Sequence, residues 1–190
     1  MRRIVVSMWI TLDGYVAGPQ DEMDWLAPDE RMMEYETSLV ADAEALLLGR
    51  ITHGDFAGAW PRIARDDSET PETRAYAQRV DDMPKIVVSR SWETAGWSNT
   101  SRVESLDADT VTRLKNDGDG DLVIYGSLGV ITALQELDMI DEYHLLMHPT
   151  AIGEGKALFQ SPTRLHLRSA EPFPSGVVLM CYAPAKSGAT

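Results

Sequence analysis

Three short turns combine glycine, serine and arginine, and each turn directly follows an apolar run. "LLLGR" ends in Gly49 and Arg50, "IVVSR" ends in Ser89 and Arg90, and "LVIYGSLG" ends in residues 126–129. Glycine lets a ligand approach the backbone closely, while arginine and hydroxyl side chains donate hydrogen bonds to it. A helix that begins at such a turn adds unpaired backbone N–H groups. These groups bind phosphate, so the turns predict a site for a phosphate-bearing ligand.

The segments that must position these turns alternate between strand-like and helix-like patterns. We expect strands at residues 3–10, 45–48, 85–89 and 121–125, and a further strand that begins at residue 141. We expect helices at residues 29–43, 105–118 and 130–137, a short helix after residue 50, and one surface helix within residues 61–84. Two further strands, at 164–173 and 176–183, indicate a closing hairpin. This order predicts an α/β fold with a mainly parallel central sheet and an antiparallel C-terminal hairpin.

The position of the turns matters as much as their composition. The carboxyl ends of parallel strands lie along one edge of a sheet, where ligands of open α/β folds bind. We therefore expect the three turns to lie close together. Glycine, serine and arginine are also common in loops, so any single turn could be an ordinary loop. The sequence has neither the GxGxxG dinucleotide motif nor the Walker GK[ST] motif, so the motifs alone do not identify the ligand.

The composition limits the class of protein. The 190 residues are 44% apolar and 25% charged, which predicts one soluble domain over residues 1–185 and a frayed tail at 186–190. A net charge of −13 argues against nucleic acid and anionic membranes as partners. No apolar stretch approaches the roughly 20 residues of a membrane span. Cys181 is the only cysteine, which fits a reducing, cytoplasmic location.

The histidines do not predict a metal site. His144 and His148 are four residues apart in an expected strand and should face the same side, but no carboxylate completes a ligand set. His53 is expected to be exposed on a helix, with a capping role or a contact with the cofactor as its alternative. We therefore expect no bound metal.

The sequence as a whole resembles the dihydrofolate reductase-like family, and within it the reductase domain of bacterial riboflavin biosynthesis (the RibD C-terminal domain) in its stand-alone form. The matching pieces are "SMWITLDGYVAG" with "DWL", "LLLGRITHGDF", "KIVVSRS" and "DLVIYGSLGVITALQELDMIDEYHLLMHPTAIGEGKALF", in the order of the family. They cover most of residues 4–159. The resemblance implies a three-layer dihydrofolate reductase-like sandwich that binds NADPH.

The resemblance also assigns each turn to a part of the cofactor. It implies that the first turn holds a cofactor phosphate, that the second meets the adenosine 2′-phosphate, and that the third lies beneath the pyrophosphate. Two basic turns favour NADPH over NADH, because the additional phosphate needs an arginine partner. The implied cofactor-binding residues are Gly49, Arg50, Thr52, Ser89, Arg90, Tyr125, Gly126, Ser127, Leu128 and Gly129.

The long loop after the first strand is where the resemblance places the nicotinamide and the substrate, bordered by Leu12, Asp13 and Gly14. Asp13 is the predicted catalytic residue, which would make a polar contact with the bound molecules or take part in proton transfer. Its alternative role is structural, because Asp-Gly is a common turn pair. Trp25 is predicted to stack on a planar substrate, with core packing as its alternative.

The resulting prediction is an NADPH-dependent reductase of a small nitrogen heterocycle, with an activity like that of 5-amino-6-(5-phosphoribosylamino)uracil reductase in riboflavin biosynthesis. A single cysteine cannot supply the His/Cys zinc site of a deaminase, so only the reductase step is expected. One alternative is pterin reduction, for which dihydrofolate reductases use an acid in their first long helix; the sequence does not decide whether Glu34 or Glu36 would match it. A second alternative is a nucleotide-binding protein without turnover.

A homodimer is expected from the family and from the apolar strand "VVLMCYA" near the C-terminus. This strand could pair or pack across a two-fold axis, or it could be internal to the fold.

Overall fold

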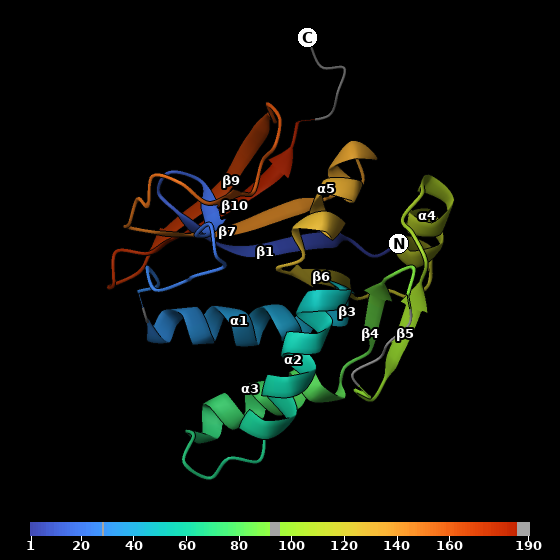
Figure 1. Ribbon diagram of the computed structural model, residues 1–190, viewed down its shortest axis with the longest axis horizontal. Helices are drawn as coiled ribbons and strands as arrows, with labels where there is room; N and C mark the ends of the chain where they lie inside the picture. The colour runs from blue at the N-terminus through green and yellow to red at the C-terminus, as the bar shows by residue number, and fades with distance from the viewer. Residues whose placement is uncertain (28, 92–95, 186–190) are drawn as a thin grey trace.

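An eight-stranded sheet organises the protein in the computed structural model, which describes residues 1–27, 29–91 and 96–185 (Figure 1). The strand order is β5-β4-β3-β6-β1-β7-β10-β9; the first six strands are parallel, and β10 is antiparallel to both of its neighbours. The strands are β1 (Ile4–Thr11), β3 (Ala43–Gly49), β4 (Lys85–Val88), β5 (Thr100–Val103), β6 (Asp121–Tyr125), β7 (Glu142–His148), β9 (Leu165–Pro172) and β10 (Val178–Pro184). A separate antiparallel pair joins β2 (Tyr15–Ala17) to β8 (Lys156–Ala157).

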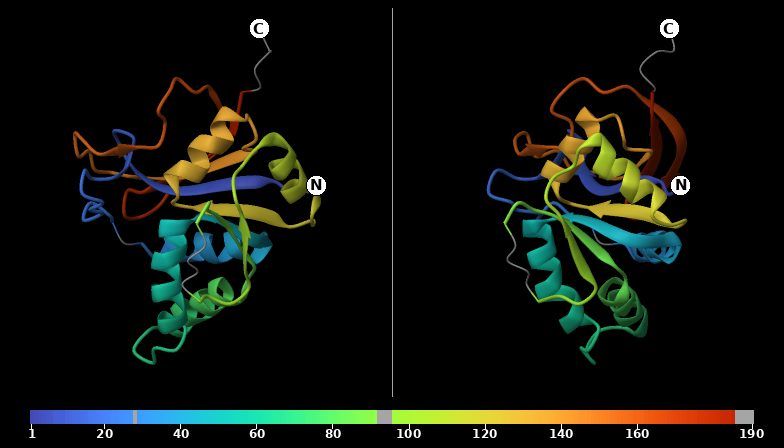
Figure 2. Two further views of the ribbon diagram at one scale, coloured as in Figure 1. Left: turned by 45° about the vertical axis from the view of Figure 1, so that its right-hand side comes forward. Right: turned by 90° about the vertical axis from the view of Figure 1, so that its right-hand side faces the viewer.

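Helices cover both faces of the sheet and give the fold three layers (Figures 1 and 2). One face carries α1 (Glu30–Asp42), α2 (Arg50–Ile63) and α3 (Pro71–Asp82), and the other carries α4 (Ala108–Asn116) and α5 (Leu128–Glu136). In β1, Val5 packs with Leu39 of α1, whereas Val6 packs with Ile131 of α5. Because both faces are covered, the central strands are continuous apolar runs.

The helices of the described ranges start in two different ways. Asp29, Thr70 and Asp107 cap α1, α3 and α4 by accepting a hydrogen bond from a backbone N–H of the first turn. In contrast, Gly49 and Ser127 precede α2 and α5 without a side-chain cap. None of the helices in these ranges combines the length and the hydropathy that crossing a lipid bilayer would take.

The second helix is longer than the sequence indicated. A short helix was expected after β3, followed by a loop from Pro61, but α2 continues to Ile63 and contains Pro61 in its last turn. Trp60 packs edge-on against Tyr76 of α3, with ring centroids 5.2 Å apart, and this contact holds the last turn against the neighbouring helix.

Short strands were also missing from the sequence prediction. β5 is mostly polar and half exposed, so its sequence has no clear period, and it forms because β4 offers a partner at the edge of the sheet. β2 and β8 lie in segments expected to be loops. The other expected strands and helices are present, including the C-terminal hairpin. The tail at 186–190, expected to be frayed, lies outside the described residues.

The carboxyl ends of the parallel strands lie at one edge of the sheet, as expected. Gly49, at the end of β3, is in register with Val88 at the end of β4. β6, which ends at Tyr125, pairs with β3 on its other side. The three turns therefore follow three neighbouring strands.

Candidate functional site

The first and third turns form one hydrogen-bonded unit. The Gly49 N–H donates to Ser127 Oγ at 2.8 Å, and the Ser127 hydroxyl donates to Thr52 Oγ1 at 2.8 Å. These bonds join the start of α2 to the start of α5. Neither start has a side-chain cap, so the unit brings together two uncapped helix N-termini, the kind of arrangement that binds anions.

Glycine is required in the third turn for a specific reason. Gly126 and Ser127 both have positive φ, at +58° and +60°. A Cβ atom on Gly126 would make only an ordinary contact of 3.4 Å with Thr52 Cγ2, so the positive φ, and not a lack of space, is what favours glycine at this position. A Cβ on Gly129 would meet no atom within 4 Å, which leaves the backbone of the first turn of α5 open to close approach.

The second turn lies next to the first. Ser89 follows Val88, the register partner of Gly49, and its N–H donates to the Val103 carbonyl of β5 at 3.0 Å. The Arg102 guanidinium donates to the carbonyl oxygens of Ser89 and Arg90 at 3.3 and 3.1 Å. Arg50 and Arg90 are both exposed. The structure thus brings the three turns to one edge, and Arg102 is a basic residue of this edge that the sequence reasoning missed because it lies on an unexpected strand.

Tyr125 directs its hydroxyl toward a buried carboxyl group. Its hydroxyl donates to Glu36 Oε2 at 2.6 Å, and Trp9 Nε1 donates to Glu36 Oε1 at 3.2 Å. Glu36 is 5% exposed, and burial raises its pKa to about 7. Glu34 instead lies on the outer side of α1, where it pairs with Arg31. Of the two acids of the first helix, Glu36 is therefore the one that faces the sheet.

Asp13 ties the loop after β1 to the loop after β7. Its carboxylate accepts hydrogen bonds from the Thr11 hydroxyl at 2.6 Å and from the N–H groups of Ile152 and Gly153 at 3.1 and 2.7 Å. The Thr11 bond and the backbone bonds lower the pKa of Asp13, so the group is ionised at neutral pH. These contacts give Asp13 a structural role at the edge where β1 and β7 end; its catalytic role stays a prediction.

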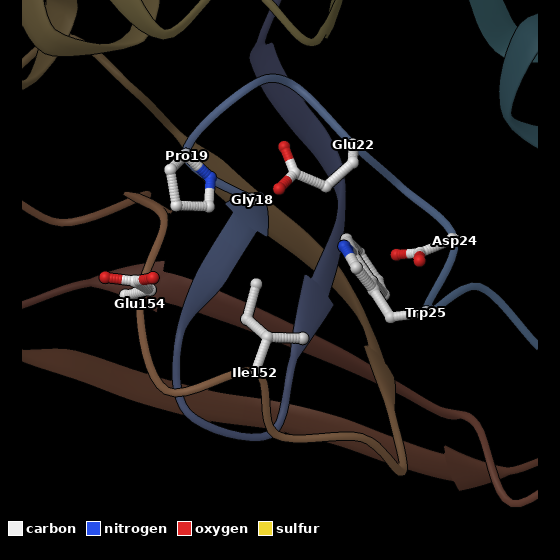
Figure 3. A pocket seen from close by; sticks show the side chains of 7 residues that line it. All are labelled: Gly18, Pro19, Glu22, Asp24, Trp25, Ile152 and Glu154. Carbon is white, nitrogen blue, oxygen red and sulfur yellow. The ribbon is translucent and has the colours of Figure 1, made fainter.

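Trp25 is buried at 7% exposure and packs edge-on against His148, with ring centroids 5.2 Å apart. His148 Nδ1 accepts a hydrogen bond from the Ala27 N–H at 3.0 Å, and burial lowers the pKa of this imidazole, so the neutral ring carries its proton on Nε2. Within the described ranges, Trp25 Nε1 and His148 Nε2 are buried without a hydrogen-bond partner. Trp25 also lines a pocket of about 210 Å³ (Figure 3). It therefore combines core packing with a surface available to a ligand.

The prediction for His53 was wrong. His53 is 3% exposed, its Nε2 lies 3.1 Å from Thr100 Oγ1, and its ring packs 5.5 Å from that of Trp97. The side chain is covered because the unexpected β5 begins at Thr100. His144 and His148 share a face, as expected, but His144 Nδ1 is bonded to the Tyr35 hydroxyl at 2.8 Å.

No three His, Cys, Asp or Glu side chains of the described ranges come together as metal ligands would.

The layered fold and these turns define a class of protein, the three-layer α/β proteins with dihydrofolate reductase-like topology. The chain belongs to the RibD C-terminal domain family, whose family model matches residues 2–179. This family is related to the reductases of riboflavin biosynthesis.

Individual relatives agree with this assignment. The uncharacterized protein YyaP of Bacillus subtilis (strain 168) is 29% identical over 185 residues, which are 95% of this chain and 94% of YyaP. A crystal structure from Shewanella sp. PV-4, assigned to riboflavin biosynthesis, matches with a TM-score of 0.73 at 21% identity over 97% of this chain and 99% of that chain.

A Thermotoga maritima structure matches with a TM-score of 0.64 at 17% identity over 97% of this chain but 57% of that chain. Its name is diaminohydroxyphosphoribosylaminopyrimidine deaminase/5-amino-6-(5-phosphoribosylamino)uracil reductase. At these identities the two solved structures establish the dihydrofolate reductase-like fold.

Proposed function

We propose that the protein is an NADPH-dependent reductase of a small nitrogen heterocycle of the aminouracil type. The observation that carries the proposal is the joint between the two uncapped helix starts, in which Gly49, Ser127 and Thr52 connect α2 to α5. Two helix N-termini held side by side favour a ligand with two linked phosphates, because their N–H groups and dipoles both attract negative charge.

The residues at this edge suit a nucleotide that carries a further phosphate. The open backbone at Gly129 would allow the pyrophosphate to approach closely. Leu128 and the backbone N–H groups at the start of α5 would then contact it. Arg50 and Arg90 place two exposed cations at one edge of a protein whose net charge is −13. Arginine binds phosphate through paired N–H donors, so these side chains support NADPH over NADH.

When bound, NADPH would supply a hydride, and the protein would supply orientation and shielding from water. Leu12, Gly14 and Trp25 are the residues we propose to border the substrate. Leu12 is 61% exposed and offers an apolar surface beside Asp13, whose carboxylate joins the loops after β1 and β7. Asp13 would contact the substrate as an ionised hydrogen-bond acceptor while it holds the two loops together.

The substrate class rests on the family. The proposed activity is like that of 5-amino-6-(5-phosphoribosylamino)uracil reductase, the activity in the name of the Thermotoga relative. Glu36 is proposed as a positioning residue for this site, because it fixes Tyr125 directly before the third turn.

We further propose a cytoplasmic homodimer that forms through β9. β10 lies between β7 and β9, so its backbone is already paired on both sides. β9 is one of the two edge strands of the described sheet, and its Leu167 is 56% exposed. An exposed edge strand with apolar side chains is a common site of association. Light scattering after size exclusion would test the dimer, and Leu167→Lys should shift it toward the monomer.

The experiment that tests the function is titration of the purified protein with NADPH and NADH separately, followed by tryptophan fluorescence and by calorimetry. Saturable NADPH binding, at least tenfold tighter than NADH binding, would support the assignment of the turns. Oxidation of NADPH at 340 nm in the presence of aminouracils would then separate a reductase from a nucleotide-binding protein without turnover. Absence of NADPH binding would overturn the proposal.

A further inference from the structure

The strand β5 lies at one edge of the sheet, beside β4, and its side chains reach two of the three turns (Figure 1). Successive side chains of a strand point to opposite faces, so Thr100 and Arg102 share one face and Val103 lies on the other. Val103 packs against the core that α4 and α5 cover. Thr100 and Arg102 therefore lie on the face that carries α2, the helix that begins at the first turn.

Thr100 connects β5 to the first turn. His53 directly follows Thr52 in α2, and the buried His53 Nε2 lies 3.1 Å from Thr100 Oγ1. Thr52 in turn accepts the hydrogen bond from Ser127 of the third turn. The start of α2 is thus linked by hydrogen bonds to β5 on one side and to α5 on the other, which fixes the position of β5 relative to both helix starts.

Arg102 connects β5 to the second turn. Its Nη1 donates to the carbonyl oxygens of Ser89 and Arg90 at 3.3 and 3.1 Å. The Ser89 hydroxyl donates to the carbonyl oxygen of Ser91. The carbonyl oxygens of three successive residues therefore all accept hydrogen bonds from within the protein. Carbonyl oxygens repel a phosphate, so a turn in which they are held by such bonds is better suited to an anion.

The same two bonds fix the backbone that carries Arg90. The Ser89 N–H is paired with the Val103 carbonyl at 3.0 Å, so the turn is attached to β5 through a backbone bond and through the Arg102 side chain. An exposed arginine binds a phosphate well only when its backbone is held in place, because ordering a mobile turn would cost binding free energy. Arg102 supplies this restraint from a neighbouring strand.

We propose that Arg102 is a positioning residue for the 2′-phosphate of the cofactor: it holds the second turn so that Arg90 meets the phosphate, and it acts through Arg90 without binding the phosphate itself. The proposal rests on the proposed reductase function and specifies which residue outside the three turns determines the preference for NADPH. It also gives a role to β5, a mostly polar edge strand.

The test is a calorimetric titration with adenosine 2′,5′-bisphosphate and adenosine 5′-monophosphate, two probes that differ only in the 2′-phosphate. The wild type should bind the bisphosphate about tenfold or more tightly than the monophosphate. In Arg102→Ala this ratio should fall about fivefold, because bisphosphate binding weakens while monophosphate binding stays within about twofold. Arg102→Lys keeps a donor for the two carbonyls and should give a ratio between those of the wild type and Arg102→Ala.

A double-mutant cycle separates positioning from direct contact. If Arg102 acts through Arg90, Arg90→Ala/Arg102→Ala should bind the bisphosphate within about twofold of Arg90→Ala alone. Additive losses would assign Arg102 its own contact with the phosphate and would overturn the proposal. An unchanged ratio in Arg102→Ala would overturn it as well.

Arg113→Ala is the matched control. It removes an exposed arginine of α4 whose guanidinium also donates a hydrogen bond, to Thr110 Oγ1 of the same helix, and it should leave the ratio unchanged. Equal weakening of both probes in Arg102→Ala would show general damage to the site and would contradict the positioning role.

Neither probe contains nicotinamide, so these outcomes are independent of the NADPH titration that tests the function. A wild type that binds neither probe, or binds both equally, would overturn the role of Arg102. Failed NADPH binding would overturn the reductase proposal instead.

Discussion

The backbone N–H of Gly49 donates a 2.8 Å hydrogen bond to the hydroxyl of Ser127, a residue 78 positions further along the chain. The same hydroxyl donates a hydrogen bond to Thr52 Oγ1, so one side chain connects the starts of two helices. A small polar residue therefore determines whether the two uncapped N-termini act on one ligand or separately.

Ser127→Ala should weaken NADPH binding about tenfold, or roughly 1.4 kcal/mol, because the two helix starts would lose their connection. The unfolding free energy should fall by about 1 kcal/mol, as for the loss of one part-buried hydrogen bond. Fluorescence titration and urea denaturation measure the two effects. Ser68→Ala, which removes an exposed loop hydroxyl, is the control. Unchanged NADPH affinity would show that the joint is structural only.

Arg90→Ala should weaken NADPH binding at least tenfold and leave NADH binding within about twofold, because the two cofactors differ only in the 2′-phosphate. Arg62→Ala serves as the control, since Arg62 is exposed and at the opposite end of α2. If both cofactors weakened in parallel, Arg90 would be assigned to a shared phosphate and the cofactor preference would need another source.

Asp13→Ala should lower kcat at least tenfold and leave the Kd for NADPH within about twofold. The substitution removes the acceptor that holds Ile152 and Gly153 beside β1, so the substrate loops would separate while the three turns stay in place. Steady-state kinetics combined with cofactor titration measures this. Asp55→Asn, at an exposed position of α2, is the control. A loss confined to NADPH affinity would contradict the assignment of Asp13 to the substrate side.

Glu36 should make the stability of the folded protein fall as pH rises toward neutrality. Burial raises the pKa of Glu36 from 4.5 to about 7, so between these values the folded state binds more protons than the unfolded state. The stabilisation is full below pH 4.5 and is lost as pH rises through 7, by up to about 3 kcal/mol. Urea denaturation at pH 5 and pH 8 should show this loss in the wild type and a smaller one in Glu36→Gln. Equal pH dependence in the two proteins would contradict it.

Lys85 should make the stability of the folded protein rise with pH in alkaline solution. Its side chain is fully buried, 4.0 Å above the Trp97 ring, and burial lowers its pKa from 10.5 to about 8. Between pH 8 and 10.5 the unfolded state binds more protons, so the Lys85 contribution to stability rises with pH. Lys85→Met should remove this rise. The unfolding free energies of the wild type and of Lys85→Met are measured at pH 8 and at pH 10. The difference between the two proteins at each pH separates the contribution of Lys85 from that of other titrating groups.

Much of the fold and the position of the turns could be predicted from the sequence, because buried parallel strands produce apolar runs and their ends lie at one edge. The choice between Glu34 and Glu36 was also within reach. The buried residues of α1 are Met32, Glu36, Leu39 and Val40, and this helical spacing places Glu36 in the apolar stripe.

The sequence could not reveal contacts that depend on unpredicted edges. His53 is buried by β5, a short polar strand without a period of its own, and Arg102 reaches the second turn from the same strand. The pocket beside Trp25 depends on two loops far apart in the sequence, the first containing Trp25 and the second containing Glu154. Such proximity follows from the pairing of β1 with β7, and no local pattern encodes it.

The central position of β1 also has a consequence for synthesis on the ribosome. β1 leaves the ribosome before the other strands of the sheet, but its neighbours β6 and β7 are among the later strands. Until they emerge, the buried strand β1 has no partner strand, and the Asp13 carboxylate has no Ile152 or Gly153 to bind. The nascent chain therefore exposes an unpaired β1 until β6 and β7 have been synthesised, and we expect this interval to favour aggregation or chaperone binding more than in a protein whose first strands pair with each other.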